Sequence, residues 1–206
     1  MSELRVAVLL SGSGRTLQNL LDLSAAGELP IEVVRVVASR PDAYGLERAQ
    51  AAGVPTAVVR RREHPDLAAF TAATFAEARA AQAELVCLAG YMKLLRPIPA
   101  DFQGRVLNIH PALIPAFAGK GFYGQRVHEA ALAAGVKVSG CTVHFVDDEY
   151  DHGPIVAQQA VPVLEEDTPE SLAQRVFAAE CELYPAAIRL FAEGRLRIEG
   201  RRARVL

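Results

Sequence analysis

The chain has 206 residues, 51% of them hydrophobic, and a formal net charge of -2 at pH 7. This length fits one large domain or two small ones, and the apolar fraction is ample for a core. The charge balance argues against a nucleic-acid surface, which would be basic overall. The three cysteines, Cys87, Cys141 and Cys181, lack CxxC spacing. We therefore expect reduced, buried thiols and a cytoplasmic protein.

The N-terminal residues run directly into an apolar segment, so no signal peptide is expected. No apolar run reaches the length of a membrane span. These features predict small-molecule partners, with no nucleic acid and no membrane, and they leave a homodimer open.

The N-terminal half alternates apolar runs of strand length with segments of helical periodicity. The predicted strands are residues 4–10, 31–38, 54–59, 84–89 and 105–109, and the predicted helices are residues 16–26, 43–52 and 66–81. Continuous apolar strands are typical of a parallel sheet that is covered on both faces. The alternation predicts an α/β fold with a doubly wound, mostly parallel and Rossmann-like sheet.

The last third of the chain has a different pattern. Residues 137–146 and 154–163 are predicted strands, and the acidic loop 147–153 between them is too short for a parallel crossover. We therefore expect an antiparallel pair. Residues 168–193 predict one long helix with an N-cap threonine and proline in its first turn. Residues 196–198 and 203–205 predict a terminal hairpin.

These elements predict one domain over residues 1–206. Its first half, to about residue 100, would bind a nucleotide or a phosphate, and its second half, from about residue 101, would carry the chemistry.

A glycine-rich loop follows the first predicted strand and opens the first helix. It comprises Ser11, Gly12, Ser13, Gly14, Arg15 and Thr16. Backbone N–H groups at a helix N-terminus bind phosphate, and glycines allow its close approach. The loop lacks both the third glycine of GxGxxG and the Gly-Lys of a P-loop. A single phosphate is therefore favoured over a dinucleotide or a triphosphate, and a tight turn without any ligand is the alternative.

Asn108 and His110 lie two apart on a predicted strand, so their side chains share one face while Ile109 points into the core. Asp151, on the acidic loop, could bring a carboxylate to the imidazole. A neutral donor, an acid–base group and an orienting carboxylate are the parts needed for acyl transfer. The alternative is a histidine with a structural role. A metal site at His110, His144 and Asp151 is not expected, because their spacing is not a metal motif.

Met92, Leu94 and Leu95 follow the fourth predicted strand. The carboxyl ends of such strands form the usual binding crevice of these sheets, so these side chains could line a slot for a flat heterocycle. Packing in the core is the equal alternative for each of them.

Three stretches, LNIHPALIP, SGCTVHFVDDEYDHGPIVAQQAV and LAGYMKLL, resemble the 10-formyltetrahydrofolate-dependent formyltransferases. The segment VAVLLSGSGRTLQNLL and the chain length resemble the branch of that family that acts on glycinamide ribonucleotide. The resemblance implies transfer of the formyl group of 10-formyltetrahydrofolate, a co-substrate, to the ribonucleotide amine in purine biosynthesis, without a metal.

The resemblance also implies roles for single residues. Asn108, His110 and Asp151 would be catalytic, the loop 11–16 would hold the substrate phosphate, and Glu180 would contact its ribose. The residues implied in folate binding are Met92, Lys93, Leu94, Leu95, Val146, Asp147, Asp148, Glu149 and Tyr150. The chain departs from the usual family residues at Thr16, Lys93, His152 and Cys181.

Three other functions remain open. Formyltetrahydrofolate deformylase shares the Asn, His and Asp but usually carries an extra N-terminal domain, which is not expected here. Methionyl-tRNA formyltransferase needs a further C-terminal domain and basic surface. A nucleotide-binding module without catalysis would not need the full set of Asn108, His110 and Asp151.

Residues 116–125 predict a mobile lid, because Gly119, Gly121 and Gly124 make this segment costly to fix. The lid would follow a rigid segment in which Ile114-Pro115 is a candidate cis peptide.

Overall fold

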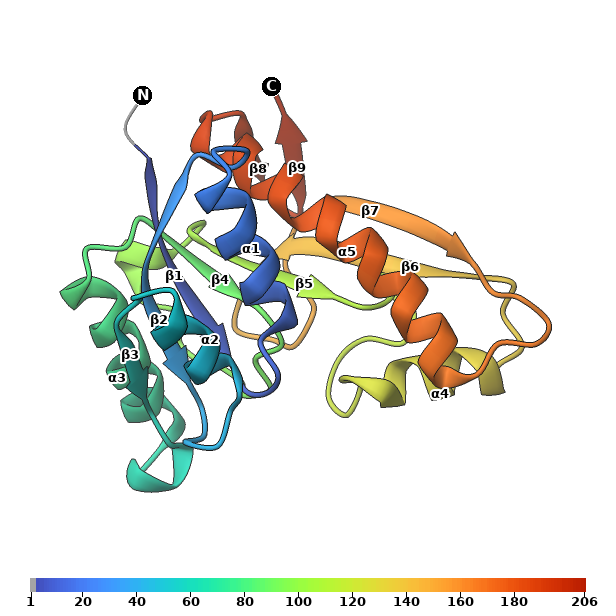
Figure 1. The fold of residues 1–206 in the computed structure, drawn as a ribbon, viewed down its shortest axis with the longest axis horizontal. Helices are drawn as coiled ribbons and strands as arrows, with labels where there is room; N and C mark the ends of the chain where they lie inside the picture. Colours follow the sequence, from blue (N-terminus) through green and yellow to red (C-terminus); the bar gives the residue numbers. More distant parts are fainter. Residues whose placement is uncertain (1–2) are drawn as a thin grey trace. The chain divides into compact units, whose positions relative to one another are not determined.

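The computed structural model describes residues 3–206, which form two compact units. The first unit ends at Leu107 and the second begins at Asn108. Figure 1 colours the first unit from blue to green and the second from yellow-green to red. Within residues 3–206, no helix combines the length and apolar character that a membrane span needs.

The first unit alternates strands and helices as the sequence predicts. Its elements are β1 (Leu4–Leu10), α1 (Arg15–Ala25), β2 (Ile31–Ala38), α2 (Gly45–Ala51), β3 (Thr56–Val58), η1 (Arg61–Glu63), α3 (Leu67–Ala80), β4 (Leu85–Leu88) and η2 (Ala100–Phe102). The strand order is β3-β2-β1-β4, and all of these pairs are parallel. The predicted strand 54–59 is shorter in the structure, because only residues 56–58 join the ladder of β2.

Helices cover both faces of this sheet. Along the chain, β2 and then β3 are added on one side of β1, and β4 is then added on the other side of β1. Right-handed crossovers then place α1 and α2 on one face and α3 on the other. Figure 1 shows α1 and α2 in front of the strands. Leu17 and Leu20 of α1, and Phe70 and Phe75 of α3, are fully buried and close this core.

The second unit is built around an antiparallel pair. Strand β5 (Val106–His110) begins in the first unit and ends in the second. The elements that follow are α4 (Gln125–Ala133), β6 (Val138–Phe145), β7 (Ile155–Pro162), α5 (Pro169–Ala192), β8 (Leu196–Glu199) and β9 (Arg202–Val205). Strands β6 and β7 are antiparallel, β9 runs parallel to β7, and β8 pairs antiparallel with β9.

Helix α5 packs on β6, β7 and α4. Its start is fixed as the sequence predicts, with Thr168 as the N-cap and Pro169 in the first turn. Ser171 completes a capping box, since its amide donates to the Thr168 hydroxyl at 3.2 Å and its hydroxyl accepts from the Thr168 amide at 3.0 Å. The parallel sheet of the first unit confirms the predicted α/β fold class. The antiparallel pair, the long helix and the terminal hairpin of the second unit are also as predicted. The span of a single domain over residues 1–206 stays a prediction.

Helix α4 was not predicted from the sequence. It has only nine residues, and its buried side chains are Val127, His128 and Ala131. His128 is buried, at 4% exposed. The cis peptide at Ile114-Pro115 is confirmed.

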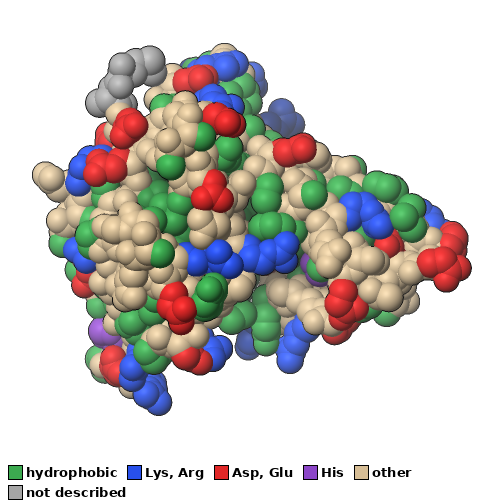
Figure 2. Space-filling view, in the orientation of Figure 1, with side chains coloured by type: hydrophobic (Ala, Val, Ile, Leu, Met, Phe, Trp, Pro, Cys, Tyr) green, Lys and Arg blue, Asp and Glu red, His purple; other side chains and the backbone are tan. Residues whose placement is uncertain are grey.

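Acidic and basic side chains share the surface. On the face drawn in Figure 2, Lys and Arg are interspersed with Asp and Glu. This distribution fits the small net charge of the chain.

Candidate active site

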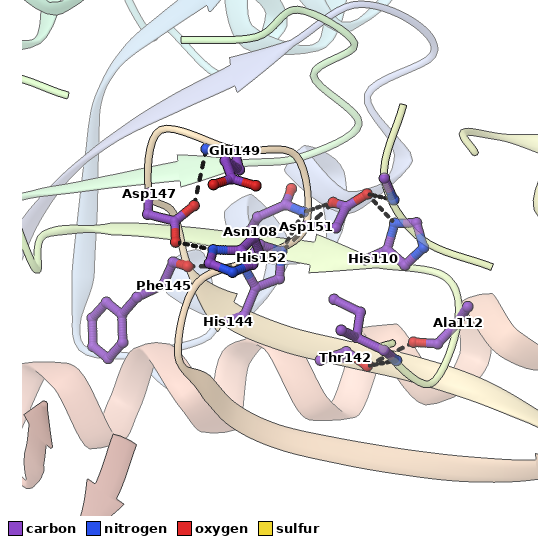
Figure 3. Close-up of polar contacts among 12 residues, drawn as sticks. Asn108, His110, Ala112, Thr142, His144, Phe145, Asp147, Glu149, Asp151 and His152 are labelled. Atoms are coloured by element: carbon purple, nitrogen blue, oxygen red, sulfur yellow. Dashed lines mark hydrogen bonds and ion pairs between the residues drawn. The ribbon is translucent and has the colours of Figure 1, made fainter. Parts of the chain in front are cut away.

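Strand β5 presents two polar side chains at its end (Figure 3). Asn108 is half-buried, His110 is 4% exposed, and Ile109 between them is buried. A polar side chain at every second position is what a strand needs to display two groups on one face. The structure thus places Asn108 and His110 as the alternation of the sequence predicts.

Asp151 lies beside both of these residues. Its Oδ2 is 3.5 Å from His110 Nδ1, and its Oδ1 is 3.4 Å from Asn108 Nδ2. The amide of Gly119 donates to Oδ2 at 2.9 Å. The contacts to His110 and Asn108 are long, and catalytic hydrogen bonds are often long before substrate binds. The three residues that the sequence singles out are therefore brought together within the second unit.

The loop that carries Asp151 has a tight base. The Phe145 amide donates to the Pro154 carbonyl at 2.9 Å. A Cβ on Gly153 would lie 1.9 Å from the Phe145 carbonyl oxygen, so only glycine fits there. Asp151 itself has φ 52°, in the left-handed region that L side chains rarely adopt. The loop brings Asp151 close to β5, and Asp151 adopts this uncommon conformation there.

His144 completes the polar cluster. The shift in the β6–β7 register between Val143 and His144 marks a bulge, and bulges re-aim side chains. His144 Nδ1 lies 2.8 Å from its neighbour's carbonyl, at Phe145, so Nδ1 carries the hydrogen and donates. In the neutral ring, Nε2 then accepts from Asn108 Nδ2 at 3.0 Å. His144 thereby orients the Asn108 amide.

His110 is flanked by acceptors on both sides of its ring. Its Nε2 donates to the Phe117 carbonyl at 2.8 Å, and Nδ1 faces the Asp151 carboxylate. Burial lowers the pKa of His110 below its usual range, although the Asp151 charge and the Phe117 carbonyl oppose this effect. The free imidazole is therefore neutral at pH 7.

Burial alone would raise the pKa of Asp151. The His144 ring, whose Nε2 is 3.7 Å from Asp151 Oδ1, the charge of His110 and the Gly119 amide outweigh that effect, so the pKa is lowered. Asp151 is a carboxylate at neutral pH. The cluster thus holds one fixed negative charge beside an imidazole that gains a proton when negative charge develops nearby.

His152 is exposed, with 43% of its side chain accessible, and its Nδ1 lies 2.7 Å from Asp147 Oδ2 within the same loop.

In the first unit, the glycine-rich loop connects β1 to α1. Gly14 is the N-cap of α1 with φ 70°, and a Cβ on it would lie 2.5 Å from the Cα of Gly45. Ser11 is 1% exposed, its amide donates to the Gly90 carbonyl, and its hydroxyl accepts from Ser39 Oγ and from the Met92 amide. Ser11 therefore holds the loop in place through buried hydrogen bonds. The parts of the loop that face outward are Gly12, Ser13, Arg15 and half-buried Thr16.

The residues implied in folate binding differ in exposure. In the first unit, Met92 is 41% exposed and Lys93 is exposed, Leu94 is half-buried, and Leu95 is 2% exposed, as core packing requires. Lys93 lines a cavity of about 500 Å³ together with Ser39, Arg40, Pro41, Arg60, Arg61 and Arg62.

In the second unit, Val146 and Asp147 are half-buried, and Asp148, Glu149 and Tyr150 are exposed. Glu180 is half-buried on α5, close enough to Cys141 that burial and the Glu180 charge together raise the pKa of that thiol to about 12.

Two contacts to the cluster come from residues that sequence reasoning assigned only to a mobile segment. The Phe117 carbonyl reaches His110, and the Gly119 amide reaches Asp151. Both contacts use the backbone, so no side-chain pattern in the sequence could have predicted them.

Comparisons with known proteins identify the family of this chain. The family model described as formyl transferase matches residues 4–188. The chain is 39% identical over 196 residues to phosphoribosylglycinamide formyltransferase of Haemophilus influenzae, covering 95% of this chain and 90% of that protein. The crystal structure of glycinamide ribonucleotide transformylase 1 from Symbiobacterium toebii matches with a TM-score of 0.93 and 52% identity, covering 99% of this chain and 94% of that chain. This protein therefore belongs to the formyl transferase family.

A longer relative contains the same region. The trifunctional purine biosynthetic protein adenosine-3 of Bos taurus is 41% identical over 195 residues, which is 94% of this chain but 19% of that protein. The chain thus spans about a fifth of the length of this relative.

Proposed function

We propose that this enzyme transfers the formyl group of 10-formyltetrahydrofolate to the amine of glycinamide ribonucleotide. The products are formylglycinamide ribonucleotide and tetrahydrofolate, in de novo purine biosynthesis. Membership of the formyl transferase family supports this proposal. The observation that carries it is the cluster of Asn108, His110 and Asp151, which offers two donors and a carboxylate in one place.

The amine attacks the formyl carbon, and the electron pair of the carbonyl bond moves to its oxygen. Asn108 donates to this oxyanion, and His110 does so once its Nε2 is released from the Phe117 carbonyl. One hydrogen of the Asn108 amide is held by His144, while the other makes only a 3.4 Å contact to Asp151 and is available. A donor aimed at developing charge lowers the activation free energy by roughly 3 kcal/mol.

Collapse of the tetrahedral intermediate breaks the bond between the formyl carbon and the folate nitrogen. The attacking amine loses one proton and the leaving nitrogen gains one, so a group must move a proton between them. His110 does this with Asp151 beside it, because the carboxylate favours the protonated ring and opposes the effect of burial.

Binding uses separate groups in each unit. The outward part of the loop 11–16, at the N-terminus of α1, holds the ribonucleotide phosphate, and Glu180 contacts the ribose. The segments 92–95 and 146–150 bind the folate. Lys93 and the arginines of its cavity, Arg60, Arg61 and Arg62, suit the carboxylates of the folate tail.

The test offers three acceptors to the purified protein with 10-formyltetrahydrofolate: glycinamide ribonucleotide, water and charged initiator tRNA. We expect a formylated ribonucleotide. Release of formate alone would instead identify a deformylase, and formylated tRNA a tRNA-modifying enzyme. Binding of both small molecules without turnover would identify a regulatory module.

We further propose that the enzyme acts in the cytoplasm, because Cys87, Cys141 and Cys181 form no disulfide within the described residues 3–206. A homodimer is the remaining proposal on partners, and sedimentation equilibrium of the purified protein tests it.

A further inference from the structure

An arginine of the terminal hairpin contacts the loop that carries Asp151. Arg201 lies at the turn between β8 and β9. Its Nη2 donates to the His152 carbonyl at 3.0 Å, and its Nη1 lies against His152 Nε2. His152 Nδ1 lies 2.7 Å from Asp147 Oδ2. A carboxylate, an imidazole and a guanidinium thus form one chain across the loop.

A carboxylate can only accept, so His152 Nδ1 carries a hydrogen and donates it to Asp147. On the other side of the ring, Arg201 Nη1 lies near both ring nitrogens, and Arg201 Nη2 donates to the His152 carbonyl. His152 thus bridges a positive and a negative partner.

The contacts restrain the backbone on both sides of Asp151. Before it, Asp147 Oδ1 accepts from the Glu149 amide at 3.0 Å. After it, the His152 carbonyl is held by Arg201. Asp151 has a left-handed φ of 52°, and such a conformation persists only where the surroundings impose it.

One side of the loop borders open space. A cavity of about 480 Å³ lies there, lined by residues of the loop and of the hairpin that include Tyr150, Asp151, His152 and Arg201. With open space beside it, the loop depends on its polar contacts.

We infer that Arg201 and His152 are positioning residues that clamp the loop 147–153 and so hold the Asp151 carboxylate against His110. This inference rests on the proposed function, in which Asp151 supports His110. Arg201 and His152 are outside the groups proposed to bind the two substrates, and they act through the position of the loop that carries Asp151.

The experiment is a steady-state kinetic comparison of Arg201→Ala, Arg201→Lys, His152→Ala and the double variant Arg201→Ala/His152→Ala. We expect turnover to fall about tenfold to a hundredfold in Arg201→Ala, because small displacements of a catalytic group carry that penalty. KM for the ribonucleotide should change little. Arg201→Lys should be intermediate, since an ammonium can replace only one of the two contacts. The double variant should be no worse than the worse single variant.

Arg204→Ala is the matched control. Arg204 is on the same hairpin and lines the same cavity, but it pairs with Glu199 at 2.7 Å and has no part in the clamp. We expect near-normal turnover. Equal turnover of Arg201→Ala, His152→Ala and Arg204→Ala would overturn the inference, as would additive losses in the double variant.

A pH profile separates positioning from mere stability. The Asp151 charge raises the pKa of His110, so a displaced carboxylate should lower the pKa that governs turnover in Arg201→Ala and in Arg201→Lys. A profile unchanged in both variants would refute the clamp even if Arg201→Ala were unstable. If His110→Ala and Asn108→Ala kept their activity, the proposed function itself would fail; if only the clamp variants kept it, the clamp alone would be wrong.

Discussion

Two loops of this protein are held in place by different means. The glycine-rich loop 11–16 is fixed by steric fit and by buried hydrogen bonds of Ser11, since Gly14 leaves no room for a side chain beside Gly45. The loop 147–153 is fixed largely by hydrogen bonds among the polar groups of Asp147, His152 and Arg201. The first arrangement suits a rigid anion site, and the second holds a charge that must stay next to a titrating imidazole.

The largest effect is expected at β5. His110→Ala and Asn108→Ala should each lower kcat by at least about a hundredfold with smaller effects on KM, because both donors act on charge that develops in the transition state. Single-turnover formylation of glycinamide ribonucleotide measures this. His64→Ala, which removes a half-exposed histidine beside Phe70 in the first unit, is the control and should stay near wild type. Near-normal turnover in both β5 variants would mean that the site is elsewhere.

Asp151→Asn tests the charged loop directly. Turnover should fall by about tenfold to a hundredfold, because the substitution removes the charge that favours the protonated imidazole while it keeps the shape. The Asp151 charge raises the pKa of His110. Loss of that charge should therefore move the pKa seen in the pH profile of kcat downward. A variant with reduced turnover but an unshifted profile would contradict the coupling between the two residues.

Gly14→Ala tests the steric loop against Gly12→Ala. The added Cβ would meet Gly45 Cα at 2.5 Å in a left-handed backbone, whereas a Cβ on Gly12 meets nothing within 4 Å. We expect Gly14→Ala to lower the free energy of unfolding by about 1–3 kcal/mol and to weaken phosphate binding, measured by calorimetry. Gly12→Ala should leave stability unchanged. If the two variants were equally stable, close packing would not be what fixes this loop.

The contrast between local and long-range contacts also explains which features could be predicted from the sequence. Apolar runs and glycines act locally, so β1, β2 and the turn into α1 follow from their own residues. The alternation of Asn108 and His110 is local as well. The link from His152 to Arg201 joins residues far apart in the chain, and the place of His144 depends on a bulge. Helix α4 was missed because nine residues with two buried aliphatic side chains carry little periodicity.

Residues 116–125 provide a third loop for the comparison. Its backbone already contacts His110 and Asp151 through Phe117 and Gly119, and the rings of Phe117 and Phe122 lie 6.4 Å apart. We still expect a lid that becomes ordered when substrate binds, because its glycines make a fixed conformation costly in entropy. Hydrogen exchange of this segment should slow in the presence of a folate analogue and the ribonucleotide. Equal protection with and without ligands would rule out a lid.

The smallest effect concerns His128, which is buried in α4. Its Nδ1 has no hydrogen-bond partner among residues 3–206, and burial, with the nearby charge of His110, lowers its pKa. A histidine whose pKa is lower in the folded state stabilises the fold above its unfolded value of about 6.5, and this contribution is lost as the pH falls from there through the folded pKa. His110 adds to the effect with the same sign. We therefore expect Tm to fall by roughly a few degrees between pH 7.5 and pH 5.5. His128→Leu should flatten this dependence, because the unfolded chain then has one fewer group to protonate. Parallel melting curves of the two proteins across this pH range would show that the buried histidine does not contribute, and would place the acid sensitivity at the catalytic cluster instead.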